Sequence, residues 1–117
     1  MISEKRTAAI AAIAADAKNG QDILILDVTR MTTIADYFLI CSGTSTPQLR
    51  AIADEVERQL AAEGEIPIHI EGYSDANWIL MDYGSVVVHI FRQETRDFYA
   101  LEHLWAEAPR MDAKDLN

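Results

Sequence analysis

The chain has 117 residues, half of them apolar and a quarter charged, as expected for one soluble globular domain with a single core. No apolar stretch approaches the roughly 20 residues that a membrane-spanning helix needs, so no membrane association is expected. The only cysteine, Cys41, cannot form an intramolecular disulfide, which favours a reducing compartment and a cytoplasmic protein. Because Cys41 lies within an apolar run, we expect a core residue and not a nucleophile.

The net charge of −9 is unevenly distributed along the chain. Residues 1–60 carry six Lys/Arg against eight Asp/Glu, whereas residues 61–117 carry four against eleven. Binding to a phosphate backbone draws on clustered Lys and Arg, which this chain lacks, so direct sequence-specific nucleic-acid binding is not expected. The acidic second half suits a basic protein partner, and it equally suits a solvated surface that keeps the protein soluble.

The N-terminal segment predicts an Ala-rich helix from Ser3, a good N-cap residue, to Lys18. Asn19-Gly20 follows and supplies the signal that ends the helix. The same segment imitates a short secretory signal, but Asp16 and Lys18 interrupt its apolar run before a convincing cleavage site. We therefore expect a helix with one apolar face.

Two buried strands and a second helix are predicted next. Residues 22–28 and 37–42 are apolar and rich in β-branched side chains, and residues 29–36 connect them. Thr46 is the expected N-cap of the helix, with Pro47 at its first position. Apolar residues then recur at helical spacing up to Gly64: Leu49, Ile52, Ala53, Val56 and Leu60.

Three further strands are predicted in the second half of the chain. In residues 66–72, the alternation of Ile66, Ile68 and Ile70 with polar residues predicts one buried face. Residues 77–83 and 85–92 flank Gly84, which is typical of a tight hairpin.

The C-terminal segment predicts a last short helix that Thr95 caps and that Pro109 ends. Four residues are expected to face inward from it: Phe98, Leu101, Leu104 and Trp105. Residues 110–117 are expected to form a flexible tail, which leaves residues 1–109 as the domain. Helices interleaved with strands predict an α/β (α+β) fold, with a mixed, roughly five-stranded sheet and packed helices.

Signals for catalysis are weak. The three histidines lack the spacing of metal ligands, and no pair of acids two residues apart lies on a strand to hold metal ions. The turn Gly43-Thr44-Ser45 precedes a helix and could bind an anion, but it lacks the extra glycines and the lysine of a phosphate-binding loop. A small nucleotidyltransferase-like enzyme or nucleotide-binding domain remains the alternative to a binding protein, and a dimerisation module is a third interpretation.

The strand over residues 77–83 is the candidate interaction surface. Alternation places Trp78, Leu80 and Asp82 on one face and Ile79, Met81 and Tyr83 on the other, where Ile79 and Met81 suit the core. Trp78 and Leu80 are either exposed and able to anchor a partner, with the charge of Asp82 on the same face, or they are covered by a further helix. Tyr83 could reach the same surface, since Gly84 breaks the alternation.

Three ordered blocks of the sequence resemble the ribosomal silencing factors, the RsfS/Iojap family. The first is Ala35-Asp36-Tyr37-Phe38-Leu39-Ile40-Cys41-Ser42-Gly43-Thr44-Ser45. The second is Trp78-Ile79-Leu80-Met81-Asp82-Tyr83-Gly84, which continues through Val86-Val87-Val88-His89-Ile90-Phe91. The third is Glu94-Thr95-Arg96-Asp97-Phe98-Tyr99, with Leu101-Glu102 and Leu104-Trp105.

This resemblance implies a nucleotidyltransferase-like fold without the catalytic acids, no enzymatic activity and no cofactor or metal. It implies a partner, the large ribosomal subunit, bound through its L-fourteen protein at the face where the small subunit docks. Occupying that face would block subunit joining and repress translation under nutrient limitation, and some members dimerise when free. The resemblance also favours the exposed-anchor interpretation, which makes the predicted partner-binding residues Trp78, Leu80, Asp82 and Tyr83.

Overall fold

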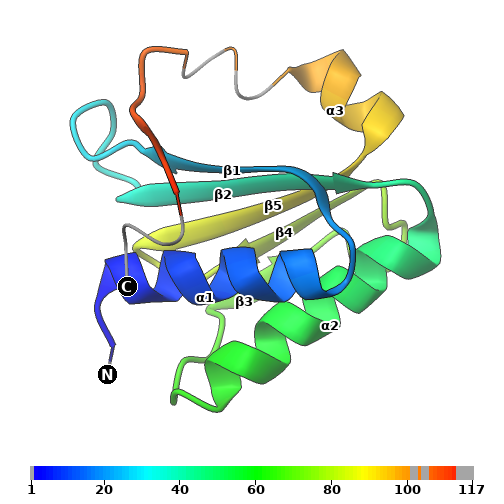
Figure 1. The fold of residues 1–117 in the computed structure, drawn as a ribbon, viewed down its shortest axis with the longest axis horizontal. Coiled ribbons are helices and arrows are strands. Elements are labelled where there is room, and N and C mark those ends of the chain that lie inside the picture. Colours follow the sequence, from blue (N-terminus) through cyan, green and yellow to red (C-terminus); the bar gives the residue numbers. More distant parts are fainter. Residues whose placement is uncertain (1, 101–102, 104–105, 113–117) are drawn as a thin grey trace.

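The computed structural model describes residues 2–100, 103 and 106–112. A mixed sheet divides the molecule, and Figure 1 shows α1 (Glu4–Ala17) and α2 (Thr46–Ala61) on one side of it and α3 (Gln93–Tyr99) on the other. The described strands are β1 (Gln21–Asp27), β2 (Tyr37–Gly43), β3 (His69–Glu71), β4 (Trp78–Asp82), β5 (Val86–Arg92) and β6 (Arg110–Met111).

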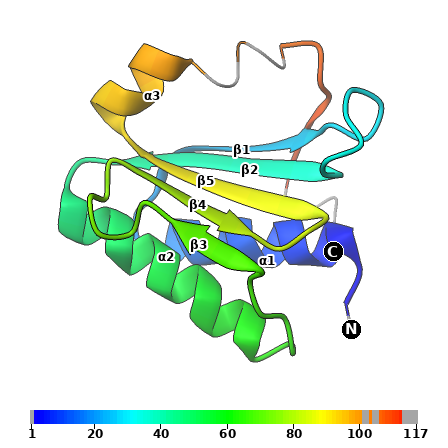
Figure 2. The ribbon, with the colours of Figure 1, turned by 180° about the vertical axis from the view of Figure 1, so that it is seen from behind.

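The strand order is β3-β4-β5-β2-β1-β6. β2 and β5 pair in parallel at the centre of the sheet, and the other described pairs are antiparallel. Figure 2 shows β3 and β4 at one side of the sheet, and β1 lies towards the opposite edge. The sequence-based α+β class is therefore confirmed, with a sixth strand added to the expected five.

α1 begins and ends where its sequence predicts. The Ser3 hydroxyl accepts a hydrogen bond from the Arg6 backbone N–H at 3.2 Å, and Asn19 adopts a left-handed φ of 63° after the last turn. Most of the alanines of α1 are buried. Small side chains let a helix approach its neighbours closely, so α1 packs against both the sheet and α2.

The N-cap of α2 is Ser45, one residue earlier than the predicted Thr46. Ser45 is extended, with φ −148°, and its hydroxyl accepts from the Gln48 backbone N–H at 3.2 Å, which is the N-cap hydrogen bond. Thr46 is already helical. The five apolar residues predicted to face the core from α2 are all buried, which confirms the helical face.

The strand predicted over residues 66–72 is wrong at its first half. Only His69–Glu71 pair with β4, while Ile66 is 78% exposed and Ile68 is 70% exposed. The ladder ends here because β4 ends at Asp82, whose carbonyl accepts from the Ile68 N–H at 2.7 Å. Pro67 has no N–H with which to extend the pairing. Ile70 alone of the three isoleucines packs against the core.

The C-terminal helix also differs from its prediction. It begins at Gln93 directly after β5, so Thr95 lies inside it and caps nothing. Phe98 is 81% exposed, because Arg96 of α3 is buried and a side chain two residues later points about 200° away around a helix. Leu101, Leu104 and Trp105 lie outside the described residues.

The expected tail is ordered at its start. Arg110 and Met111 form β6, which pairs with Leu26 and Ile25 of β1, so this part of the predicted tail is wrong. Residues 113–117 lie outside the described residues.

Both faces of the sheet contribute to the core. One cluster lies between the sheet and α1 and α2, and it includes Cys41, which is fully buried as predicted. A second cluster occupies the opposite face around Phe38, Ile40 and Phe91. None of the described helices has the length and apolar character to cross a membrane.

Candidate partner-binding surface

Three rows of side chains cross β4, β5 and β2 on the sheet face opposite α1 and α2. The register pairs each β4 residue with one on β5 and, through it, with one on β2. Residues directly opposite each other in a ladder share a face, so each row forms a continuous strip. The rows are Trp78–Phe91–Ser42, Leu80–His89–Ile40 and Asp82–Val87–Phe38. We call the β4 members of these rows, Trp78, Leu80 and Asp82, the β4 surface.

The β4 surface is neither core nor fully exposed. Trp78, Leu80 and Asp82 are half-buried, whereas Ile79 and Met81 between them are fully buried against α1 and α2. Trp78 and Leu80 pack on the second hydrophobic cluster. The alternation of burial along β4 predicted from the sequence is therefore confirmed.

Trp78 lies in an aromatic group formed with β5 and β2. Its ring centroid is 4.9 Å from that of Phe91 and 5.9 Å from that of His89. Phe38 meets the His89 ring edge-on at 5.1 Å. The indole Nε1–H donates to His89 Nδ1 at 3.1 Å. Such contacts restrict the rotamers of Trp78, so the side chain is ordered before any partner binds.

Asp82 supplies the negative charge of the β4 surface. Its Oδ1 accepts from the Gly84 backbone N–H at 2.7 Å, which fixes the turn between β4 and β5. Its Oδ2 lies 3.7 Å from Nδ1 of His69, whose Nε2 is 2.8 Å from a Glu71 carboxylate oxygen. The carboxylate therefore has a structural role in the hairpin and remains 27% exposed to carry charge at the surface.

Tyr83, the fourth predicted binding residue, lies with the opposite cluster. It packs against the core formed by α1 and α2, and burial raises the pKa of its hydroxyl. That hydroxyl has no hydrogen-bond partner among the described residues. The structure thus brings three of the four predicted residues onto one face and separates the fourth from them.

Sequence reasoning missed the aromatic support beneath the surface. The sequence places Phe38, His89 and Phe91 on strands and within the blocks that resemble the family, but it does not predict their contacts with Trp78. The turn consists of Gly84 and Ser85, which pairs Leu80 with His89 and Trp78 with Phe91. Centring the hairpin on Gly84 alone would shift this register by one residue, so the sequence signal does not find these contacts.

The features considered for catalysis do not assemble. Within the described part of the chain, no three His, Cys, Asp or Glu side chains come together as a metal site. At the turn Gly43-Thr44-Ser45, the Thr44 backbone N–H already donates to Gln48 Oε1 at 2.7 Å. A Cβ at Gly43 would stand 2.8 Å from the same oxygen, so the turn is filled by the Gln48 side chain. This packing favours a capping turn over an anion site.

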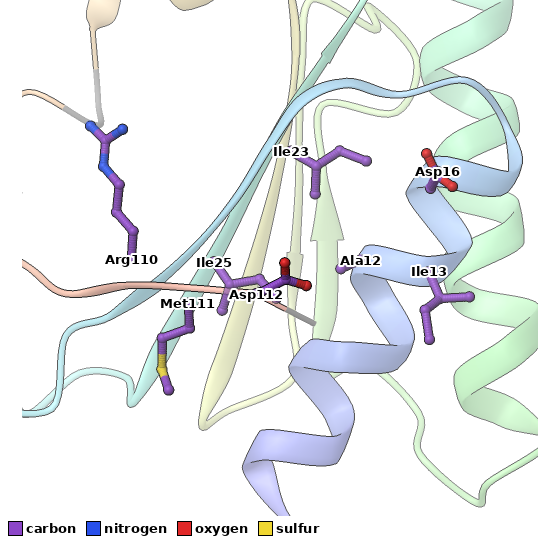
Figure 3. Close-up of a pocket in the computed structure, with 8 residues that line it drawn as sticks. All are labelled: Ala12, Ile13, Asp16, Ile23, Ile25, Arg110, Met111 and Asp112. Atoms are coloured by element: carbon purple, nitrogen blue, oxygen red, sulfur yellow. The ribbon is translucent and has the colours of Figure 1, made fainter. Parts of the chain in front are cut away.

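A separate groove of about 550 Å³ lies between α1 and the β1–β6 edge (Figure 3). Its apolar lining comes from Ala12, Ile13, Ile23, Ile25 and Met111. Asp16, Arg110 and Asp112 complete the lining. This lining offers apolar contact and charge, without a nucleophile or a histidine for proton transfer.

The fold and the β4 surface together define a single α+β domain with a mixed sheet, one face under two helices and the other carrying a preordered aromatic and acidic strip. The family model described as "Ribosomal silencing factor during starvation" matches residues 2–117. The chain therefore belongs to the ribosomal silencing factor family, which confirms the resemblance seen in the sequence.

Individual relatives agree with this assignment. A protein from Bacillus subtilis (strain 168) named ribosomal silencing factor RsfS is 44% identical over 111 residues, covering 95% of this chain and 94% of that protein. A mouse protein named mitochondrial assembly of ribosomal large subunit protein 1 is 36% identical over 91 residues, covering 75% of this chain and 40% of that one. A crystal structure of a Chromobacterium violaceum protein superposes with a TM-score of 0.88 at 30% identity, covering 90% of this chain and 88% of that one.

Proposed function

We propose that this protein binds the large ribosomal subunit through its L-fourteen protein and blocks joining of the small subunit. The β4 surface makes the contact with the large subunit. The protein acts in the cytoplasm, and its binding lowers translation when nutrients are scarce. The observation that carries the proposal is the half-buried indole of Trp78, which His89 holds by a hydrogen bond on the strand face that also carries the Asp82 carboxylate. Family membership supplies the ribosomal context.

The chemistry of the surface suits a basic protein partner. Binding energy at interfaces concentrates in a few aromatic anchors that lie among near-neutral contacts, and Trp78 has the size and order of such an anchor. Asp82 adds a charge that attracts Lys or Arg and discriminates against acidic partners. Steric blocking requires only occupancy of the right face, so no catalytic group is needed.

A homodimer in the free state forms part of the same proposal. An aromatic surface that is half-buried in the monomer can shield itself against a second copy, and binding to the ribosome would then compete with self-association. Light scattering on purified protein at several concentrations measures this equilibrium directly.

The experiment that tests the proposal is sedimentation of a cell lysate through a sucrose gradient. We expect the protein to migrate with free large subunits and to be scarce on assembled ribosomes. Raising the salt concentration should weaken the association, though less steeply than for a protein that neutralises many phosphates. Migration only at the top of the gradient, at low salt and physiological protein concentration, would overturn the proposal.

A further inference from the structure

His89 is the residue that fixes the position of Trp78. Its side chain lies on the neighbouring strand β5, is 5% exposed, and receives the Trp78 indole N–H on Nδ1 at 3.1 Å. Phe38 packs on one side of the imidazole and Phe91 stacks near it, with its ring centroid at 6.1 Å. The ring contacts with Phe38 and Phe91 therefore fix the position of His89, and the hydrogen bond from Trp78 ties the indole to it.

The direction of this hydrogen bond determines the state of the imidazole. An indole N–H can only donate, so Nδ1 of His89 is the acceptor and the proton of the neutral ring is on Nε2. Burial lowers the pKa of His89 to about 4. The ring is therefore neutral near pH 7, and Nδ1 remains available to accept.

We propose that His89 is a positioning residue of the β4 surface: it orients the Trp78 indole before a partner arrives and occupies the indole N–H. This inference rests on the proposed function. It follows that Trp78 offers a partner its ring face and edge, and not a hydrogen-bond donor. The matching group on the partner is an aliphatic side chain or a guanidinium that stacks on the ring.

Ordering Trp78 in advance contributes to affinity. A side chain that is already in its bound rotamer loses less conformational entropy on association than a mobile one. Removing the Nδ1 acceptor frees the indole and also leaves its N–H to find water. We expect a loss of about 3- to 10-fold in affinity for the large subunit, the range of one hydrogen bond.

A double-mutant cycle tests this role on the full chain. His89→Leu removes the acceptor, whereas His89→Asn keeps an oxygen near the position of Nδ1. We expect His89→Leu to weaken binding to purified large subunits and His89→Asn to retain it. In a Trp78→Ala background, His89→Leu should have no further effect, because its influence passes through the indole. Equal affinities of His89→Leu and wild type, or an unchanged effect without Trp78, would overturn the inference.

A second measurement does not depend on the ribosome or on any variant that could fail to fold. In wild-type protein, nitrogen NMR should show His89 protonated on Nε2, and the Trp78 indole N–H should exchange slowly with solvent. A proton on Nδ1 would contradict the positioning role.

If wild-type protein shows the expected NMR signals but does not bind large subunits, the proposed function fails and the partner role of His89 fails with it. If binding is normal but the His89→Leu variant retains it, the inference alone fails.

Discussion

The guanidinium of Arg96 lies 3.1 Å from the hydroxyl oxygen of Ser42, and both side chains are buried. The same hydroxyl donates to the backbone carbonyl of Gln21 at 3.3 Å. Ser42, on the central strand β2, therefore connects two elements: it donates to a backbone carbonyl of β1 and accepts from the guanidinium of Arg96 on α3. Because hydrogen bonds to charged groups are stronger than neutral ones, this contact is important for docking α3 on the sheet.

Ser42→Ala should destabilise the domain by about 1.5–3 kcal/mol, since it leaves a buried cation with one acceptor fewer. Urea unfolding followed by circular dichroism measures the change. Ser74→Ala is the matched control: Ser74 is exposed on the loop between β3 and β4, so the same loss of a hydroxyl should change stability by less than about 0.5 kcal/mol. Similar effects of the two substitutions would contradict a structural role for the Ser42–Arg96 contact.

Buried His89 predicts that acid destabilises the fold. Burial lowers its pKa to about 4 in the folded protein, whereas an exposed histidine in the unfolded chain titrates near 6.5. Between these values the unfolded chain binds the proton that the folded protein excludes. Its contribution to stability is complete above about pH 6.5 and falls as the pH drops towards 4, by up to about 3 kcal/mol.

The matched comparison for this prediction is wild type against His89→Asn, with urea unfolding at pH 7 and pH 4.5. Carboxylates titrate in both proteins, so the difference between their pH profiles isolates the histidine. Parallel profiles would show that His89 is not responsible for the acid sensitivity.

Trp78→Ala and Asp82→Asn should both weaken binding to the large subunit, for different reasons. Loss of the indole removes an interface anchor and should lower affinity about 30- to 1,000-fold, with about 2 kcal/mol of folding stability lost as well. Asp82→Asn keeps the oxygen that accepts from Gly84, so it should fold normally and lose about 2- to 5-fold in affinity through its charge.

Asp16→Asn provides the control for charge, because it makes the same change on α1, across the sheet from the β4 surface. Thermal melts and sedimentation with purified large subunits should be recorded for all three variants. Normal binding by both β4 variants would place the contact elsewhere on the protein.

The Cys41 thiol should be inert in the native protein. Burial raises its pKa to about 12, so almost none of it is thiolate at pH 8. We expect a thiol-specific reagent to modify it at the rate of unfolding in buffer and rapidly in concentrated urea. Fast modification of folded protein would show that the strand β2 is accessible to solvent.

Ile66 and Ile68, which precede β3, and Ile70, which lies within it, should respond unequally to substitution. Ile66→Ser and Ile68→Ser should alter stability by less than about 0.5 kcal/mol, because both side chains are exposed. Ile70→Ser should cost more than either, since this side chain packs against the main core. Chemical denaturation of the three variants provides the comparison, and three equal losses would contradict the start of β3 at His69.

Local signals explain which elements could be predicted from the sequence. Ser3 and Asn19 delimit α1 through cap chemistry, and Gly84 fixes the β4–β5 hairpin, so these boundaries follow from neighbouring residues. Ile66 and Ile68 have the alternation of a buried strand, but they are exposed because β4 is too short to pair with them. The residues around Ile66 and Ile68 give no information about the length of β4.

The candidate surface follows the same division. Alternation along β4 assigned Trp78, Leu80 and Asp82 to one face, which the structure confirms. Alternation alone assigns Tyr83 to the face of Ile79 and Met81, and it packs there towards α1 and α2; the expected break at Gly84 does not bring it to the β4 surface. The support of Trp78 by His89 required the pairing register, which becomes certain only when the sheet is assembled.

The parallel pairing of β2 with β5 has a consequence for synthesis of the chain. Tyr37 pairs with Val86 and Gly43 with Arg92, so the central strand cannot gain this neighbour until most of the polypeptide has left the ribosome. At roughly 5–20 residues per second, the delay lasts several seconds. Throughout it, a strand whose seven residues are all buried in the finished protein has an open edge. Chains that terminate before residue 86 keep that edge, and we expect them to aggregate or be degraded.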